Sequence, residues 1–413
     1  MSIAQRLRGA GGSQRASTLE LFYDLVFVFA VTQVSHLLLE HLTWTGVLES
    51  SILLLAVYWS WNYTTWMTNE LDTETVPVRL LLLFLMLMSL LMSVAIPQAF
   101  EAHALLFAGS YVVIQIGRHA FLAFAAAGRG TLERERAVRI IIYFLAAGVF
   151  WISGALVGGA AMIALWLVAL AIDYGAGIVM LWVPGLRRME ASDWTVGAEH
   201  FAERFGLFVI LALGETIVLT GATTSGEELT PARILAFVMA FLATAAIWWL
   251  YFTQVATIGE RYLEISEDSS RLAVDVYTYL HVVFVAGIIL SAVGDELVIA
   301  HPTEVLPPYE VAAVVAGPAV YLVAHTLFGY RLTGSLTKRK VVATLACVAL
   351  GFVGLFVPAL VLAGLLVVVL AALIVSNYLL PSPAGASGEA FPTEQPEAST
   401  VGRNPESRVN RTE

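Results

Sequence analysis

The sequence predicts an all-α polytopic membrane protein, and three observations lead to this fold class. Hydrophobic residues make up 59% of the 413 residues and charged residues only 13%, whereas a soluble domain has about 25% charged residues. The hydrophobic residues gather in segments of about 20 residues or more, the length that a helix needs to cross the roughly 30 Å hydrocarbon core of a bilayer. Lys and Arg, finally, fall mainly in alternate connections between these segments.

Breaks in the hydrophobic pattern divide the chain into about twelve predicted transmembrane helices. They span residues 18–41, 44–69, 76–99, 102–127, 137–156, 159–184, 199–222, 231–257, 271–299, 309–330, 339–357 and 359–379. Only Val357-Pro358-Ala359 separates the last two. The run from Val341 to Leu379 is too long for one crossing at about 1.5 Å per residue, so the proline favours a tight turn there.

The distribution of Lys and Arg predicts that both termini are cytoplasmic and that the protein lies in the cell membrane. With the N-terminus inside, the inner connections collect nearly all basic residues of the membrane region, and Arg233 is the clear exception. The N-terminal stretch lacks the pattern of a cleaved signal peptide, so the first helix is expected to be retained. The chain then divides into a cytoplasmic segment, a six-helix repeat, a cytoplasmic connector, a second six-helix repeat and a disordered cytoplasmic tail: residues 1–17, 18–184, 185–198, 199–380 and 381–413.

The first predicted helix carries a polar stripe on an otherwise apolar segment. Glu20 and Asp24 lie four residues apart and therefore share one helix face. Glu20 sits at the helix start, where a carboxylate complements the helix dipole, but Asp24 is one turn deeper than that role needs. A helix that only anchored the chain would not need the stripe, so this one is predicted to face a protein-lined interior or a pathway. Further polar residues follow toward its other end: Thr32, Gln33, Ser35 and His36.

The two groups of six helices resemble each other, which predicts an internal repeat. Glu20-Leu-Phe opens the first helix and Glu203-Arg-Phe the seventh, and each of these helices leads into a segment rich in Trp and Tyr, 58–63 and 248–252. Six helices per unit is an even number, so the halves would run parallel about a pseudo-twofold axis along the membrane normal, as in many transporters. Chance similarity between hydrophobic stretches is the alternative. The Trp and Tyr groups fit interfacial belts and packing, with an aromatic ligand cage as their alternative.

Ionisable residues inside the predicted helices are the remaining candidates for function, because a charge near the bilayer centre costs about 2.5–3.5 kcal/mol on insertion scales. Asp173, Glu215 and His281 lie well inside their helices, and Arg118 lies in the inner part of the fourth. In a functional reading, Glu215 and Asp24 are protonatable groups, Arg118 and Asp173 form a coupling or structural pair, and His281 contacts substrate or protons.

Each of these residues also has a structural reading. Arg118 fits a counter-ion for Asp173 or Glu215, and His281 fits a neutral imidazole that bridges two helices. Glu203, like Glu20, fits a helix-start acid. Gly214, which precedes Glu215, is expected to let another helix approach closely.

Several classes of function are disfavoured. The chain has no basic groove for nucleic acid, and its single cysteine, Cys347, belongs to no Cys/His metal cluster. It also lacks a phosphate loop, a nucleophile elbow, His-Glu-x-x-His and Cys-x-x-Cys. We therefore expect no cofactor and no metal, and an enzyme is less expected than another kind of membrane protein.

Three motifs resemble the bacterial low temperature requirement A (LtrA) family. They are Glu20-Leu-Phe-Tyr-Asp-Leu-Val-Phe-Val28 with Thr32-Gln33 and Ser35-His36, then His200-Phe-Ala-Glu-Arg-Phe-Gly206 with Leu213-Gly-Glu-Thr216, and Tyr279-Leu-His281 with Gly287. The first two are quite specific, and together they cover most of the membrane region. The resemblance implies a polytopic membrane protein connected with growth at low temperature, and it leaves the chemistry to the residues.

The leading hypothesis from the sequence is a transporter of an ion or small solute, with proton coupling through intramembrane carboxylates as an option. A membrane-embedded enzyme for a lipid or hydrophobic substrate is the first alternative, with Asp24, Glu215 and His281 as acid and base groups. A membrane sensor or structural protein, in which polar residues only join helices, is the second. The expected partners are the lipid bilayer and an unidentified small solute or ion.

Overall fold

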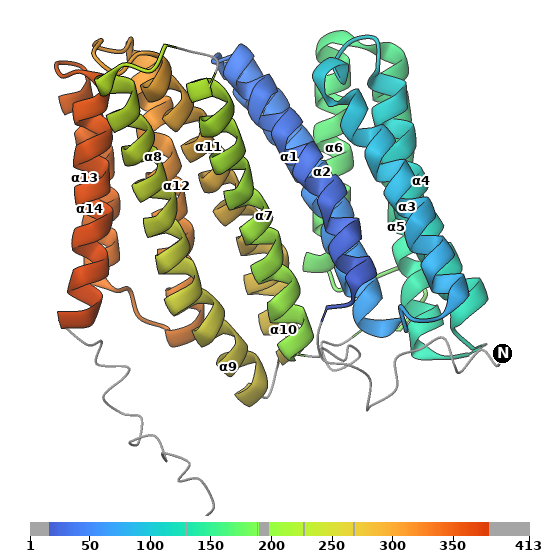
Figure 1. The fold of residues 1–413 in the computed structure, drawn as a ribbon. Helices are drawn as coiled ribbons and strands as arrows, with labels where there is room; N and C mark the ends of the chain where they lie inside the picture. Colours follow the sequence, from blue (N-terminus) through green and yellow to red (C-terminus); the bar gives the residue numbers. More distant parts are fainter. Residues whose placement is uncertain are drawn as a thin grey trace, which may run out of the picture.

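The chain folds into a bundle of long helices that run side by side, as the computed structural model shows (Figure 1). The structure describes residues 16–128, 130–187, 189, 198–225, 228–266 and 269–379. The predicted tail lies outside the described residues, as do residues 1–15 of the N-terminal segment and most of the connector between the halves.

The described helices form twelve rods. Six belong to the first half: α1 (Thr18–Glu40), α2 (Trp44–Glu70), α3 (Val76–Ala95) with the short η2 (Ile96–Gln98), α4 (Ala104–Phe121) with the π-helical η3 (Leu122–Ala126), α5 (Leu132–Val157) and α6 (Gly159–Ile178). Six belong to the second: α7 (Ala198–Ser225), α8 (Pro231–Leu250) with the π-helical η5 (Tyr251–Ala256) and α9 (Thr257–Ile265), α10 (Ser269–Ala273) with the π-helical η6 (Val274–Leu280) and α11 (His281–Ala300), α12 (Pro308–Thr333), α13 (Lys338–Gly354) and α14 (Ala359–Leu379).

The expectation of an all-α membrane protein is confirmed. Ten of the rods in the described part of the chain are long and apolar enough to cross a membrane. The other two are α2, which carries many polar side chains, and α13, which has 17 residues. The turn expected at Pro358 is also present, since α13 ends at Gly354 and α14 begins at Ala359.

Local sequence explains where the helices begin. Ser17 and Glu20 form a capping box at the start of α1, in which each side chain accepts a hydrogen bond from the other residue's backbone N–H. Thr43, Thr131 and Thr230 cap α2, α5 and α8 with their hydroxyl groups. The cap at Thr131 is the reason that α5 begins five residues before the predicted start, in a charged stretch that hydropathy alone excludes.

The predicted sixth helix was too long. It ends at Ile178 rather than at residue 184 because Met180 and Leu181 adopt left-handed backbone conformations, with φ of 53° and 50°. Residues other than glycine rarely take that conformation, and it costs about 1–3 kcal/mol per residue. The surrounding packing therefore holds this turn in place.

The two halves of the chain meet at α1 and α7. In Figure 1, α3 to α6 lie to the right of this pair and α8, α12, α13 and α14 to its left. Helix α1 packs against α2, α3, α7 and α11, and α7 packs against α8 and α11. Helix α1 begins and α14 ends at the same side of the bundle, the lower side in Figure 1.

Small residues bring α11 and α12 together most closely. A Cβ atom added to Gly287 would lie 2.6 Å from the backbone nitrogen of Tyr321, and one added to Gly317 would lie 2.5 Å from that of Ser291. Close approach through glycine and serine is a common way for membrane helices to pack. The expectation for Gly214 was wrong, because a Cβ there would meet no atom within 4 Å.

This packing makes a stability prediction. Gly287→Ala and Gly317→Ala should each lower the melting temperature of the purified protein, because overpacking costs about 1–3 kcal/mol. Gly364→Ala in α14 is the matched control, since its added Cβ meets nothing within 4 Å and alanine favours a helix by about 0.8–1 kcal/mol over glycine. Thermal unfolding in one detergent compares the three variants. Equal melting temperatures for all three would contradict the close contact of α11 and α12.

Candidate functional site

Helices α1 and α7 are joined by two buried pairs of ionisable side chains at the side where α1 begins. Glu20 Oε1 accepts a hydrogen bond from His200 Nε2 at 3.2 Å, while its other oxygen caps the helix by accepting from Ser17 N at 2.8 Å. Both side chains are buried. Glu20 is therefore the helix-start acid that the sequence predicted, and it also contacts the other half of the chain.

Asp24 pairs with Arg204 one turn further along. Arg204 Nη2 donates to Asp24 Oδ1 at 2.8 Å, and the indole nitrogen of Trp61 donates to the same oxygen at 2.8 Å. The two charged side chains are 2% and 0% exposed, so each neutralises a charge that the interior would otherwise disfavour. The guanidinium carbon also lies 6.0 Å from the centre of the Trp61 ring.

A second polar cluster lies toward the opposite ends of α1 and α7. Thr32 donates a hydrogen bond to Oε2 of Glu215, whose side chain is buried. Glu296 on α11 is close enough to Glu215 and His36 to interact with them electrostatically. His36 is exposed at the surface of the bundle. We call Thr32, His36, Glu215 and Glu296 the upper polar cluster.

The remaining candidates on α1 and α7 are more peripheral. Gln33 is half-buried next to Thr32. Glu203 is half-buried at the start of α7 and accepts a hydrogen bond from the backbone N–H of Ala16 at 2.7 Å. That bond ties the beginning of the described chain to the second half.

Asp173 and Arg118 lie in the first half, but they form no direct ion pair. Asp173 Oδ2 accepts from the Tyr111 hydroxyl at 2.7 Å and from the Trp151 indole at 3.1 Å. Arg118 Nη1 donates to the Ser60 carbonyl at 2.7 Å and to the Thr64 hydroxyl at 3.0 Å. The expected direct pairing of Arg118 with Asp173 or Glu215 is absent from the ion pairs of the described residues.

His281 joins two π-helical turns. Its Nδ1 lies 2.8 Å from the carbonyl oxygen of Val276 in η6, and its Nε2 lies 2.8 Å from the hydroxyl of Tyr251 in η5. A carbonyl only accepts, so Nδ1 donates and Nε2 accepts from the tyrosine, which suits a neutral imidazole. The ring also stacks on Tyr277 at 4.8 Å. This geometry matches the bridging role considered for His281.

A cavity of about 660 Å³ opens between the two halves of the chain. Its lining comes from the second half of α2, the ends of α4 and α6 and the start of α5, and from α10 and η6 of the second half. All these segments lie at the side of the bundle where α1 begins (Figure 1). None of the nine residues selected from the sequence lines this cavity.

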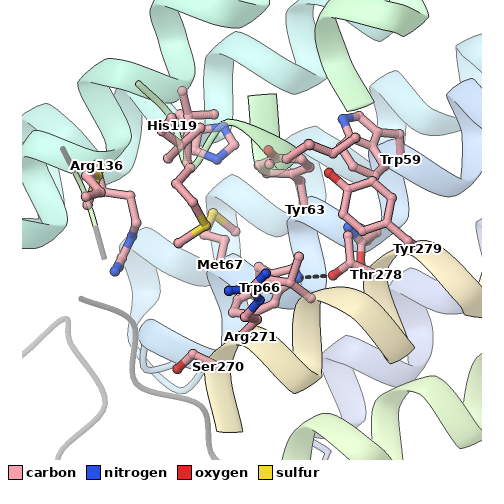
Figure 2. A pocket seen from close by; sticks show the side chains of 18 of the residues that line it. Trp59, Tyr63, Trp66, Met67, His119, Arg136, Ser270, Arg271, Thr278 and Tyr279 are labelled. Carbon is pink, nitrogen blue, oxygen red and sulfur yellow. Dashed lines mark hydrogen bonds between the residues drawn. The ribbon is translucent and has the colours of Figure 1, made fainter. Parts of the chain in front are cut away.

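Aromatic and polar side chains share the cavity wall. Figure 2 shows His119 and Arg136 on one side, Trp59 and Tyr279 on the other, and Trp66 below. Of the two predicted aromatic groups, the first therefore lines the cavity, as the ligand-cage alternative requires. The second does not, since Trp248 and Trp249 are 44% and 42% exposed on α8 and fit an interfacial belt.

The backbone around the cavity departs from regular α-helix. The π-helical turns η3 and η6 both contribute lining residues, among them Leu122 and Thr278. The left-handed residues Met180 and Leu181 contribute as well. π-Helical turns and strained residues are frequent at functional sites, so the cavity is the main candidate site of the molecule.

Sequence reasoning missed three kinds of residue. His200 and Arg204 are four residues apart, as are Glu20 and Asp24, and this matched spacing of opposite charges could have revealed the pairing. Glu296 was overlooked, with Asp295 beside it, because it lies near the end of its helix. Asn62, in the cavity wall, gives no such signal, since the cavity depends on how distant segments pack.

The arrangement is that of a pocket with aromatic and polar walls. No group of three or more His, Cys, Asp or Glu side chains in the described ranges is placed to hold a metal ion. Asp24, Glu215 and His281, the acid and base groups of the enzyme alternative, each bind a different partner and do not converge on the cavity.

Comparison with known proteins identifies relatives of the chain. The family model described as bacterial low temperature requirement A protein (LtrA) matches residues 15–375. An uncharacterized protein of Rhizobium meliloti (strain 1021) is 36% identical over 322 residues, which cover 77% of this chain and 78% of the relative. No solved structure matches.

The pair of Asp24 and Arg204 can be tested by a double-mutant cycle. Asp24→Leu or Arg204→Met alone should destabilise the protein by about 3–5 kcal/mol, because each leaves one buried charge without its partner. The double variant should recover most of that loss. The half-exposed pair of Asp275 and Arg331 serves as the control, and its single variants should change stability by about 1 kcal/mol or less.

Folded yield and thermal unfolding in detergent measure the cycle. Additive losses in the Asp24 and Arg204 double variant would show that the two charges do not stabilise each other.

Proposed function

Given that the chain belongs to the bacterial low temperature requirement A family of multi-pass membrane proteins, we propose that it is a transporter of a small solute or ion. In this proposal the protein works by alternating access: the cavity opens first to one side of the membrane and then, after a conformational change, to the other. The observation that carries the proposal is the position of the cavity, whose walls come from both halves of the chain. Binding sites between two helix groups are the usual arrangement in transporters.

The order of neighbours along each half supports a parallel repeat. Helix α1 packs against α2 and α3, and the series α3, α4, α5, α6 continues with each helix against the next. Helix α7 packs against α8 and α11, and the series α11, α12, α13, α14 follows in the same manner. This agrees with the proposed six-helix units and with rocking of one unit against the other.

The basic residues support a cytoplasmic position for both termini and for the cavity. Arg136, Arg271 and the cluster at Lys338–Lys340 lie at the ends of helices on the side where α1 begins, and Arg233 lies at the opposite ends. Positive charge favours the cytoplasmic face. The proposed state of the structure is therefore inward-facing, in the cell membrane.

Glu215 is the proposed proton-coupling residue. It is buried, accepts from Thr32 through one oxygen, and its Oε1 has no hydrogen-bond partner among the described residues. A buried carboxylate with a free oxygen can take up and release a proton, as relay residues in membrane transporters do. The upper polar cluster would pass protons toward the side opposite the cavity.

A sensor or structural role is the second candidate, and one observation favours it. Glu20, Asp24 and His281 all form hydrogen bonds that connect one helix to another. If the polar residues only connected helices, the interior would be expected to have no cavity. This bundle has a cavity next to those contacts, so transport is the better-supported function.

Cysteine accessibility tests orientation and alternating access without knowledge of the solute. Cys347 is the only cysteine, so Cys347→Ala gives a background into which single cysteines can be placed. Ser270→Cys, at the cavity, should react with a membrane-impermeant thiol reagent in inside-out vesicles, and more slowly from the outside of intact cells. Ser225→Cys, exposed at the far end of α7, should react from outside.

Ser93→Cys controls for non-specific reaction, because Ser93 is fully buried in α3 and should react from neither side. Labelling of Ser270→Cys from outside alone would reverse the proposed orientation. Complete absence of labelling at Ser270→Cys from both sides would contradict an open cavity.

Proton movement tests Glu215 directly. Liposomes that contain the protein and a pH-sensitive dye should dissipate an imposed pH gradient faster than empty liposomes. Glu215→Gln should return the rate to that of empty liposomes with the same folded yield, because the amide cannot take up a proton. Glu304→Gln, in an exposed loop, is the control and should behave as the unaltered protein. An unchanged rate in Glu215→Gln would remove Glu215 from the mechanism.

A further inference from the structure

Three of the four charged side chains that line the cavity form ion pairs, and the fourth, Arg271, is exposed and also has an interaction partner. Arg136 donates to a carboxylate oxygen of Glu70, both at the cavity wall. Asp275 accepts two hydrogen bonds from Arg331, at 2.6 and 2.9 Å. Since a charge brought into a partly buried site needs a partner of opposite sign, these pairs leave little attraction for an ion. The cavity therefore suits a solute without net charge.

The aromatic walls are held rigidly. Trp59 stacks on Tyr174 with ring centres 3.8 Å apart, and Tyr63 packs edge-on against Trp59 at 5.2 Å. Trp66 donates its indole N–H to the Thr278 hydroxyl at 2.9 Å, across the boundary between the halves (Figure 2). Trp59 is covered by these neighbours, while the rings of Tyr63, Trp66 and Tyr279 are half-buried at the cavity wall. These held rings offer flat faces without a further loss of side-chain freedom, and flat faces favour a flat ligand.

Two buried side chains of the cavity wall carry polar atoms without partners. The amide oxygen and amide nitrogen of Asn62 and the indole nitrogen of Trp59 have no hydrogen-bond partner among the described residues. Asn62 is 0% and Trp59 1% exposed, and both line the cavity. An unpaired buried polar group costs about 1–3 kcal/mol. One acceptor atom, the amide oxygen of Asn62, and two donor atoms, its amide nitrogen and the indole nitrogen of Trp59, are therefore unpaired next to the aromatic walls.

We propose that the cavity binds small uncharged molecules that have a flat conjugated ring with an amide-like edge. The ring would pack between the aromatic side chains, and an N–H next to a C=O would pair with the amide of Asn62. The volume of about 660 Å³ leaves ample room for one or two fused rings, within the 300–1,000 Å³ range of small-molecule sites. This inference names the solute class of the transport function proposed above and rests on it.

Equilibrium binding to the full chain in lipid nanodiscs tests the class with four ring compounds of similar size. The probes are 2-pyridone, which has the amide-like edge, N-methyl-2-pyridone, which lacks the N–H donor, benzoate as an anion and N-methylpyridinium as a permanent cation. Saturation-transfer NMR and quenching of tryptophan fluorescence measure affinity. We expect 2-pyridone to bind about tenfold more tightly than the other three, the effect of about one or two hydrogen bonds.

Two variants assign the binding to the cavity. Asn62→Leu should weaken 2-pyridone binding about tenfold and leave the melting temperature equal or higher, because it removes an unpaired buried polar group. A purely structural asparagine would instead lower the melting temperature. Trp59→Phe keeps an aromatic ring but removes the N–H, and it tests the same site if Asn62→Leu fails to fold. Trp248→Phe, on the lipid-facing side of α8, is the control and should change nothing.

Each outcome decides the proposal. Equal binding of 2-pyridone and its N-methyl derivative, or undiminished binding to folded variants of Asn62 and Trp59, overturns the amide-like edge. Tighter binding of benzoate or N-methylpyridinium overturns the uncharged class, and no binding of any probe overturns both. Because binding is measured without movement across a membrane, 2-pyridone binding in a protein whose cysteines show one-sided access would refute transport and leave the solute class standing.

Discussion

The pairing of buried ionisable side chains between α1 and α7 is the constraint on which the rest of the structure depends. Glu20 with His200 and Asp24 with Arg204 place four ionisable side chains in the interior of an apolar bundle. Each alone would be costly to bury, and together they fix which faces of α1 and α7 meet and in which register. The contact between α1 and α7 therefore fixes how the two halves of the chain pack against each other.

The cavity follows from where that contact lies. Next to the α1–α7 contact, α2 faces η6 across the boundary between the halves, and Trp66 with Thr278 bridges it. The same boundary contains π-helical turns and two left-handed residues, whereas α11 and α12 pack closely through glycine. The irregular turn η6 and the closely packed α11 follow each other in one rod. In the proposed rocking motion the irregular turns change shape to open and close the cavity, while the contact of α11 with α12 and the pairs between α1 and α7 stay intact.

The sequence predicted the parts of the fold that depend on local chemistry. Helix number and most boundaries follow from hydrophobic segment length, and the capping role of Glu20 follows from its position. For Asp24 and Arg204 only the matched spacing of opposite charges was available as a signal. The partners of Arg118 and the Tyr251 partner of His281 could not be predicted in this way, because they come from segments distant in the sequence. Asn62 was missed for the same reason: in the sequence it is one polar residue among aromatic ones, and only packing places it at the cavity.

The distance between the two halves of the chain, on the side of the bundle where the cavity lies, gives the most direct test of alternating access. Double electron–electron resonance measures this distance between spin labels at Glu133 on α5 and Arg261 on α9, with the protein in nanodiscs. Rocking about the α1–α7 contact predicts two distance populations whose ratio changes when 2-pyridone is added. One narrow population that no added solute shifts would contradict a transporter and leave a rigid binding or structural protein.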